Sequence, residues 1–403
     1  MAYLRFARPL IRNFPQQQTQ EPTQEEVQEV YQEYVDERVS LFEELTPEQK
    51  IAQLMAYPLT IKNSDDEQLL NEKPLEATAS VQLVQLEPGL ITIFGSKISF
   101  EEARHYLQLI ERLFAGKKTS PLFAVDHEGG AVQRFSGAGF TPLPSWREIC
   151  AFTEQEQLIL FSSSAQELQD LGVNIVFAPV VDINSSVLKN RTCTDFESSA
   201  ITAKSYISAF GEKQIMPVIK HFPGLGQTTK DLHFSSESVY LAADDTLIFS
   251  RLLDAFPNIG VMSSHLQLKE KLDGLPCSMS AECLSVFEEE FPSVVIFTDA
   301  LEMKALDSIV ILLAKEFEFL TIGQDSETNT SQLLPEARLA VVSHQAIMAG
   351  NDVLVYGPDV KGEQLFAVSR ELASHYQQDE EFAKKVDLSV LKLLAVKKIN
   401  NAE

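Results

Sequence analysis

The chain has 403 residues, of which 44% are hydrophobic, so it can hold one large domain or two smaller ones and bury a sizeable core. Its 33 basic and 58 acidic residues give a formal charge of −25, which makes non-specific binding to nucleic acid or to an anionic membrane a poor hypothesis. An anionic substrate would need a local cluster of lysine and arginine.

The N-terminal region divides into a Gln- and Pro-containing stretch over residues 1–22 and a predicted helix over 23–39. The helix begins with a capping-box pattern at Thr23-Gln24-Glu25-Glu26, after which apolar residues recur at helical spacing. It could pack on the body of the protein or on a partner. We therefore expect an N-terminal extension over 1–40, loose and then helical, and a main domain over 41–403.

Eight short apolar or β-branched runs follow, separated by tens of residues, which leaves room for a helix and two loops each time. They are Leu54 to Leu59, Leu90 to Phe94, Leu122 to Val125, Ile175 to Val181, Ile215 to Ile219, Ile259 to Met262, Val294 to Phe297 and Val353 to Tyr356. Alternating buried strands and helices indicate a parallel sheet covered by helices. Eight such units fit an α/β fold of the (β/α)8 (TIM) barrel type, with a doubly wound sheet as the alternative.

A barrel of this kind places functional residues just after its strands, at the C-terminal face. Ionisable residues follow five of the eight runs, which is more than the solvation of surface loops requires. They are Asp126, His127 and Glu128 after the third run, Asp182 after the fourth, Lys220 and His221 after the fifth, His265 after the sixth and Asp299 after the seventh.

The loop after the fifth run is the most informative segment. Lys220-His221-Phe222-Pro223-Gly224-Leu225-Gly226 is followed by Asp231-Leu232-His233, which places a cation, two imidazoles and a carboxylate within 14 residues. An aspartate two residues before a histidine can hold one ring nitrogen and leave the other free to shuttle a proton. The segment is therefore typical of an active-site rim.

Five residues carry open alternatives. Asp126 and Arg134 flank a glycine pair, where they could exchange hydrogen bonds with sugar hydroxyls or form a structural ion pair in a turn. Asp299 stands at a strand end, which suits a rigidly supported nucleophile, although a lone aspartate there is more often a helix cap. Arg191 could reach the site as a second cation or remain on the surface. His265 could contact a ligand or be a satisfied rim histidine.

The cysteines and histidines indicate no metal site. Cys150, Cys193, Cys277 and Cys283 are scattered without a Cys-x-x-Cys pair, so we expect reduced thiols rather than a disulfide framework. No metal-binding spacing joins the histidines to the acids. No run of about 18 apolar residues and no signal-peptide pattern is present, which predicts a cytoplasmic protein without a membrane span.

Seven motifs, in order and at plausible spacing over residues 41 to 400, resemble glycoside hydrolase family 3, and more narrowly its single-barrel bacterial β-N-acetylglucosaminidases. They are D-x-E-G-G-x-V-Q-R-F from Asp126, N-x-x-F-A-P-V-x-D-x-N from Asn174, K-H-F-P-G from Lys220, D-x-H from Asp231, P-x-x-x-S from Pro276, T-D-A-L-x-M from Thr298 and A-G-x-D from Ala349.

The resemblance implies roles for individual residues. Asp299 would be the nucleophile, His233 the acid/base and Asp231 its orienting partner. The residues implied to line the N-acetylglucosamine pocket are Asp126, Arg134, Arg191, Lys220 and His221. The implied activity is two-step retaining hydrolysis of terminal β-linked N-acetylglucosamine, from cell-wall muropeptides during recycling, by a protein without cofactor or metal that we expect to be a monomer.

Departures from the family pattern keep alternatives open. Leu225 and Leu232 stand where the family usually has histidine and serine, the loop 189–194 lacks two glycines and an aromatic, and residues 308–334 resemble an insertion. A phosphorylase of the same branch would use the same nucleophile and Asp-His pair. Attack by the substrate's own 2-acetamido group is disfavoured by the position of Asp299. The remaining alternative is a non-catalytic binding or interaction homologue.

Overall fold

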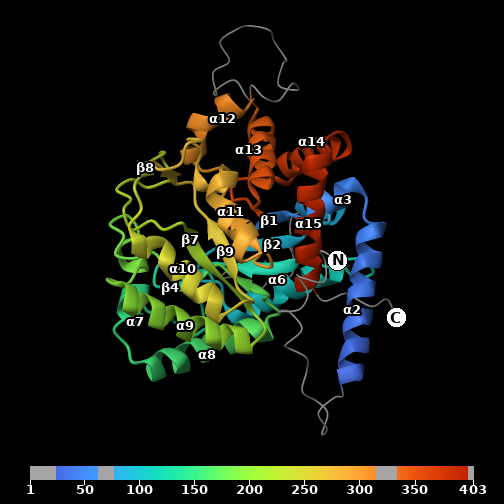
Figure 1. Ribbon diagram of the computed structural model, residues 1–403. Coiled ribbons are helices and arrows are strands. Elements are labelled where there is room, and N and C mark those ends of the chain that lie inside the picture. The colour runs from blue at the N-terminus through green and yellow to red at the C-terminus, as the bar shows by residue number, and fades with distance from the viewer. Residues whose placement is uncertain (1–23, 62–76, 315–333, 398–403) are drawn as a thin grey trace.

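A parallel eight-stranded barrel forms the centre of the protein (Figure 1). The computed structural model describes residues 24–61, 77–314 and 334–397. The barrel strands are β1 (Met55–Thr60), β2 (Leu90–Phe94), β3 (Leu122–Val125), β6 (Ile175–Val176), β7 (Met216–Phe222), β9 (Gly260–Ser263), β11 (Ile296–Thr298) and β12 (Leu354–Val355). They lie in the order β11-β9-β7-β6-β3-β2-β1-β12, and a parallel bridge between Phe297 and Val353 joins the two outer strands. The predicted (β/α)8 barrel is confirmed.

Each of the eight predicted runs contributes a strand, and the bounds differ most from the prediction in two of them. The run from Ile175 to Val181 is a strand only at β6 and meets β7 again through a single bridge from Val180 to Lys220. Pro179 interrupts it because proline has no N–H to donate to the ladder. Strand β7 instead continues past Ile219 to Phe222, so Lys220 and His221 belong to the strand itself rather than to the loop after it.

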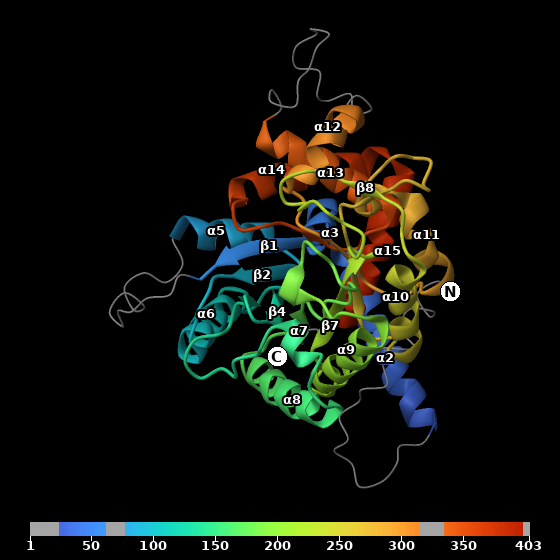
Figure 2. The same cartoon turned by 90° about the vertical axis from the view of Figure 1, so that its left-hand side faces the viewer.

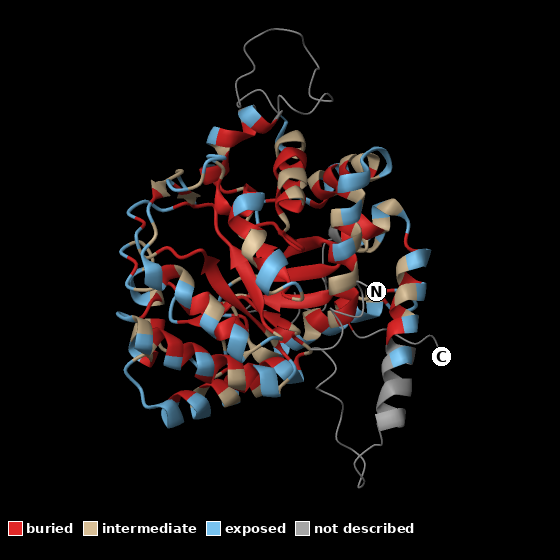
Figure 3. Cartoon of the chain, in the orientation of Figure 1, coloured by how far each residue is buried: buried red, intermediate tan, exposed pale blue. Residues whose placement is uncertain are grey.

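Helices surround the barrel on all sides in the two views (Figures 1 and 2). They include α3 (Pro47–Gln53), α5 (Ala77–Leu86), α6 (Phe100–Leu113), α8 (Glu154–Asp170), α9 (Phe196–Glu212), α10 (Ala243–Ala255), α11 (Ala281–Glu290), α13 (Pro335–Ala349), α14 (Gly362–Gln378) and α15 (Glu380–Val396). Capping boxes fix several starts, among them Thr46 with Gln49 and Thr153 with Glu156. Buried residues form the strands and the inner helix faces, and exposed ones the outer faces (Figure 3).

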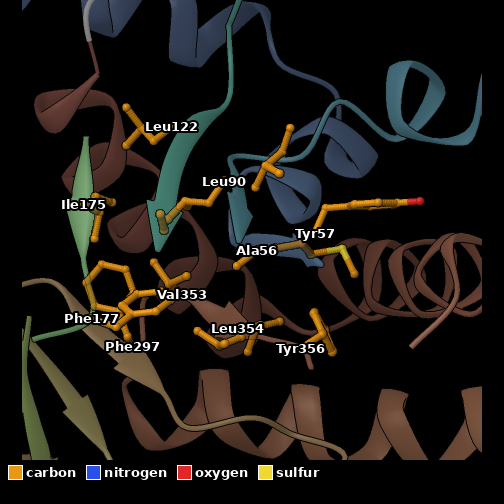
Figure 4. Close-up of a cluster of buried hydrophobic side chains, with 14 of the residues drawn as sticks. Ala56, Tyr57, Leu90, Leu122, Ile175, Phe177, Phe297, Val353, Leu354 and Tyr356 are labelled. Carbon is orange, nitrogen blue, oxygen red and sulfur yellow. The ribbon is translucent and has the colours of Figure 1, made fainter. Parts of the chain in front are cut away.

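Apolar side chains from strands far apart in sequence fill the centre (Figure 4). The rings of Phe177 and Phe297 meet edge to face with centroids 5.7 Å apart, and Val353 lies beside them. Burying a side chain of this size stabilises the fold by about 1.5–3 kcal/mol relative to leaving it exposed. Because Phe297 belongs to β11 and immediately precedes Thr298 and Asp299, this packing fixes a strand end that carries a site residue.

The predicted N-terminal helix is present as α2 (Gln24–Glu44), and it packs on the chain's own body beside α15 (Figure 1). Arg38 is buried there, where its Nε donates to the carbonyl of Leu394 at 2.9 Å and its Nη2 to that of Lys397 at 2.8 Å. Residues 1–23 lie outside the described residues. So does most of the predicted insertion: its first part forms α12 (Asp307–Ala314), and residues 315–333 are not described.

The expectation of four reduced thiols is wrong, because the structure pairs the cysteines as Cys150–Cys193 and Cys277–Cys283. Cys150 ends the short helix α7 (Trp146–Ile149), which packs against η2 (Lys189–Arg191), two residues before Cys193. The fold thus brings distant cysteines to Cα separations of 5.9 and 5.3 Å, within disulfide range. Among the residues described, no helix has the length and apolar character needed to cross a membrane.

Candidate active site

A cavity of about 650 Å³ opens at the C-terminal ends of the barrel strands. Its walls come from residues at the ends of β1, β2, β3, β7, β9, β11 and β12 and from the loops that follow. All eight residues predicted for the site line this cavity: Asp126, Arg134, Arg191, Lys220, His221, Asp231, His233 and Asp299. Figure 2 views the molecule from the side on which α7 and β4 (His127–Gly129), an element directly after β3, lie in Figure 1.

A cluster of five charges forms one wall of the cavity. Lys220 Nζ lies 3.1 Å from Asp126 Oδ1 and 2.6 Å from Glu128 Oε1. Arg134 Nη2 donates to Asp126 Oδ2 at 3.0 Å. Arg191 donates two hydrogen bonds to the carboxylate of Glu128, from Nε at 2.7 Å and from Nη2 at 2.9 Å. We call these five residues the ion cluster.

The ion cluster holds its members in their charged forms. Burial by itself raises the pKa of Asp126 and Glu128, but Lys220 and the neighbouring arginines outweigh it and hold both pKa values below the ordinary range. Burial likewise lowers the pKa of Lys220, and the two carboxylates reverse the shift and raise it. The wall therefore offers donors and acceptors of fixed protonation to a polar ligand.

Glu128 is a site residue that sequence reasoning did not assign. It is 1% exposed and joins Lys220 of β7 to Arg191 of η2. The sequence marks Asp126-His127-Glu128 as a run of ionisable residues after a strand. It does not show that Glu128 has basic partners, because one of them, Arg191, is 63 residues away in the chain. The open question about Arg191 is answered, because the residue reaches the cavity wall.

His221 is oriented by a second residue that was not assigned, Asp182. The Nδ1 of His221 lies 2.7 Å from Asp182 Oδ2, and the backbone N–H of His221 donates to the same oxygen at 3.2 Å. The N–H of Leu225 donates to the other oxygen at 2.6 Å. Asp182 thus fixes both the ring and the Gly-rich loop, and Nε2 is the ring nitrogen of His221 left for the cavity.

Asp299 follows β11 and is half-buried in the cavity. Its backbone N–H donates to Ser263 O at 2.8 Å, and its Oδ1 accepts the N–H of Ala300 at 2.8 Å. Burial raises its pKa, but His221, His265 and the Ala300 N–H favour the charged form and the pKa lies below the ordinary value. Asp299 is therefore a carboxylate at neutral pH.

His265 and Arg338 stabilise the loop that follows Asp299 by hydrogen bonds to its backbone carbonyls. His265 lies 2.7 Å from Ser278 Oγ through Nδ1 and 2.9 Å from Ala300 O through Nε2, so it is the satisfied histidine of the two alternatives rather than a cavity-lining residue. Arg338 of α13 donates to the carbonyls of Leu301 at 3.1 Å and Met303 at 3.0 Å. Arg338 had no signal in the sequence, where it resembles any helical surface arginine.

His233 and Asp231 form the pair that their spacing predicts. His233 Nδ1 lies 2.7 Å from Asp231 Oδ1, which also accepts the backbone N–H of His233 at 2.9 Å. Burial raises the pKa of Asp231, but these contacts outweigh it and lower the pKa. The imidazole is 62% exposed at the cavity, with Nδ1 engaged and Nε2 available to a ligand.

Glu302 adds a fifth carboxyl to the cavity, beside Asp299. It lies opposite the end of β12, where its Oε2 accepts the N–H of Gly357 at 2.9 Å. A Cβ at Gly357 would lie 1.7 Å from Glu302 Oε1, so a larger residue there would displace the carboxyl from this position. Burial and the neighbouring Asp299 raise the pKa of Glu302. Over the described ranges, no three His, Cys, Asp or Glu side chains are grouped as a metal site.

Residues 46–387 match the family described as glycosyl hydrolase family 3 N terminal domain. The chain belongs to this family. It is 35% identical over 209 residues to a beta-hexosaminidase of Nitrosospira multiformis, an alignment that covers 48% of this chain and 58% of that protein. It is 30% identical over 191 residues to the beta-hexosaminidase LpqI of Mycobacterium tuberculosis, covering 44% and 48%. The aligned part is thus about half the length of these curated relatives.

The likeness in fold extends further than the alignments. The solved structure of M. tuberculosis LpqI has a TM-score of 0.69 to this chain at 22% identity, and the match covers 90% of this chain and 97% of that one. At this level of identity the comparison supports the barrel fold, as the strand order does independently.

Proposed function

We propose that this family member is a retaining exo-β-N-acetylglucosaminidase that uses no metal or cofactor. One observation supports it most strongly: an ionised carboxylate at a strand end, Asp299, shares a cavity with a histidine, His233, whose Nδ1 is held by Asp231. A nucleophile needs a rigid, charged carboxylate, and an acid/base needs one free ring nitrogen. The names of the curated relatives support the sugar, since both are beta-hexosaminidases.

The sugar-binding part of the proposal rests on the ion cluster and His221. A pyranose presents hydroxyl and amide groups that both donate and accept hydrogen bonds. Asp126 offers acceptor oxygens, while Arg134, Arg191 and Lys220 offer donors, each held by a partner within 3.1 Å. Preoriented groups of this kind lose little freedom on binding, which favours recognition of a neutral polar ring.

The proposed reaction has two steps. Asp299 attacks the anomeric carbon and forms a glycosyl-enzyme ester, while His233 Nε2 gives its proton to the departing glycosidic oxygen. His233 then takes a proton from water, which attacks the same carbon and releases Asp299 with retained configuration. Asp231 holds the ring in one orientation, so that Nε2 is placed to give its proton in the first step and to take one from water in the second. The histidine thus replaces one of the two carboxylates that this reaction usually uses.

Muropeptide fragments as substrate and a cytoplasmic location remain part of the proposal. The two disulfides weigh against the location, because disulfides persist in oxidising compartments and are rare in the cytosol. Titration of free thiols in protein isolated under acid quench tests it: four reactive thiols support a reducing compartment, and none supports an oxidising one.

The test of the activity is hydrolysis of 4-nitrophenyl N-acetyl-β-D-glucosaminide by the wild type and Asp299→Ala, with and without phosphate. We expect a wild-type activity that the variant loses while it keeps its fold, because Asp299 lies at the cavity and outside the core. A strong phosphate dependence with a sugar-phosphate product would support the phosphorylase. No turnover by folded wild type across a range of aryl glycosides would support the non-catalytic homologue.

A further inference from the structure

Phe234, the residue after His233, exposes an aromatic ring beside the cavity without lining it. Its side chain is 71% exposed, whereas Leu232, two residues earlier, is buried in the core. The rings of His233 and Phe234 have centroids 6.4 Å apart and planes inclined at 49°. The imidazole thus lines the cavity, while the neighbouring phenyl ring is exposed and does not line it.

The loop that carries Phe234 is held in place from several directions. The N–H of Phe234 donates to Asp231 O at 3.1 Å, which closes a tight turn around His233. Glu237 accepts the N–H groups of Thr229 and Lys230, each at 2.9 Å, across the base of the loop. The N–H of Lys304, from the loop after Asp299, donates to His233 O at 3.4 Å. A ring on so tethered a segment loses little further freedom on contact with a ligand.

The position of the ring relative to the acid/base points to the part of the substrate it would meet. This step rests on the proposed function. If the N-acetylglucosamine fills the cavity and His233 Nε2 reaches the glycosidic oxygen, the group attached to that oxygen lies beyond His233, on the outer side of the cavity. Phe234 is the exposed aromatic residue adjacent in sequence to that histidine.

We propose that Phe234 is a specificity-determining residue for the leaving group and that it stacks against a pyranose ring there. The axial C–H bonds of a β-linked pyranose form an apolar face, and an aromatic ring provides a flat apolar surface of matching size. The site thus takes a saccharide as leaving group in preference to a small alcohol. Phe234 stabilises the leaving sugar in the Michaelis complex and the transition state, and it takes no part in bond making.

The test compares two substrates whose leaving groups are both alkyl alcohols. N,N′-diacetylchitobiose has a pyranose on the leaving side, and methyl N-acetyl-β-D-glucosaminide has a methyl group. Both leaving groups need a proton from His233, so a change in the ratio of their kcat/KM values from wild type to variant reports on contact with the leaving group. The variants are Phe234→Ala, Phe234→Leu and Phe234→Tyr, with Phe152→Ala as the control, since Phe152 is an exposed aromatic, 38% accessible, that does not line the cavity.

Phe234→Ala is expected to lower kcat/KM for the disaccharide by about three- to tenfold, the usual range for one aromatic contact, and to leave the methyl glycoside within twofold. Phe234→Tyr should restore the ratio, Phe234→Leu should restore part of it, and Phe152→Ala should not change it. Equal effects on both substrates, or no effect on either, would overturn the proposal while the hydrolase assignment stands. If the wild type cleaves neither substrate nor any aryl glycoside, the proposed function itself fails.

Discussion

Lys220 is the residue whose removal tests the electrostatics of the site most sharply. It is 3% exposed and lies between two carboxylates, Glu128 at 2.6 Å and Asp126 at 3.1 Å. Lys220→Met keeps the length of the stem and removes the charge. Breaking a buried ion pair by removing one partner costs about 3–5 kcal/mol, because the other charge is left without compensation. Arg134 and Arg191 still contact the two acids, so we expect the lower end, about 3 kcal/mol at neutral pH.

The pH dependence of this loss has a defined sign. In the wild type the pKa values of Asp126 and Glu128 lie below their ordinary values of 3.8 and 4.5, so the pairs contribute stability above those values and lose it as pH falls further. In Lys220→Met the lysine no longer offsets the effect of burial, so the pKa values of both acids lie above those in the wild type. As pH falls, the acids of the variant therefore take up protons at a higher pH than those of the wild type. The deficit of Lys220→Met should therefore be largest near pH 7 and shrink as pH falls toward about 4.

Urea unfolding of the wild type and Lys220→Met across this pH range measures the deficit directly. Lys118→Met is the matched control, since Lys118 pairs with Glu44 at the surface at 2.7 Å and its loss should cost less than about 1 kcal/mol. A Lys220→Met deficit no larger than that of the control, or one that grows as pH falls, would refute the reasoning.

Two further predictions concern the acid/base and the disulfide near Arg191. His233→Ala should lower kcat/KM for methyl N-acetyl-β-D-glucosaminide on the order of 100- to 10,000-fold and that for the 2,4-dinitrophenyl glycoside far less, because only the first leaving group needs a proton; equal losses would exclude the acid role. Cys193→Ala and Cys150→Ala should each lower the free energy of unfolding by up to about 4 kcal/mol, since the bond closes a 43-residue separation. Both should also raise KM by loosening the Arg191 segment, and an unchanged KM in thermal and kinetic assays would contradict that coupling.

The barrel was predictable because its strands are short, fully buried and separated by helices, a pattern that few folds share. The Asp231–His233 contact was predictable for a local reason, since two residues of spacing allow one carboxylate oxygen to reach both the backbone N–H and the ring. Strand bounds were less accurate where a proline interrupts the ladder at Pro179 or where β7 continues through Lys220.

What the sequence did not reveal depends on contacts between distant segments. In the sequence Glu128 resembles a surface acid, and only the fold shows that η2 places Arg191 beside it. Asp182 likewise resembles a loop residue, and only the fold shows that the next strand places His221 against its carboxylate. The cysteine pairs, separated by 43 and 6 residues, follow no recognisable spacing because the packing of α7 on η2, and of η3 (Cys277–Met279) on α11, brings them together. The division at residue 40, the insertion over 308–334 and the monomeric state stay predictions.

The central claim is that Asp299 bonds to the sugar during turnover, and intact-mass analysis of His233→Ala with 2,4-dinitrophenyl N-acetyl-β-D-glucosaminide tests it most directly. The activated leaving group lets the first step proceed without an acid, while loss of the base slows the second step, so the glycosyl-enzyme should accumulate. We predict one N-acetylglucosaminyl adduct, mapped by peptide sequencing to Asp299 and absent when Asp299→Ala is added. An adduct on another residue, or continued turnover of the double variant at the rate of His233→Ala, would contradict the account.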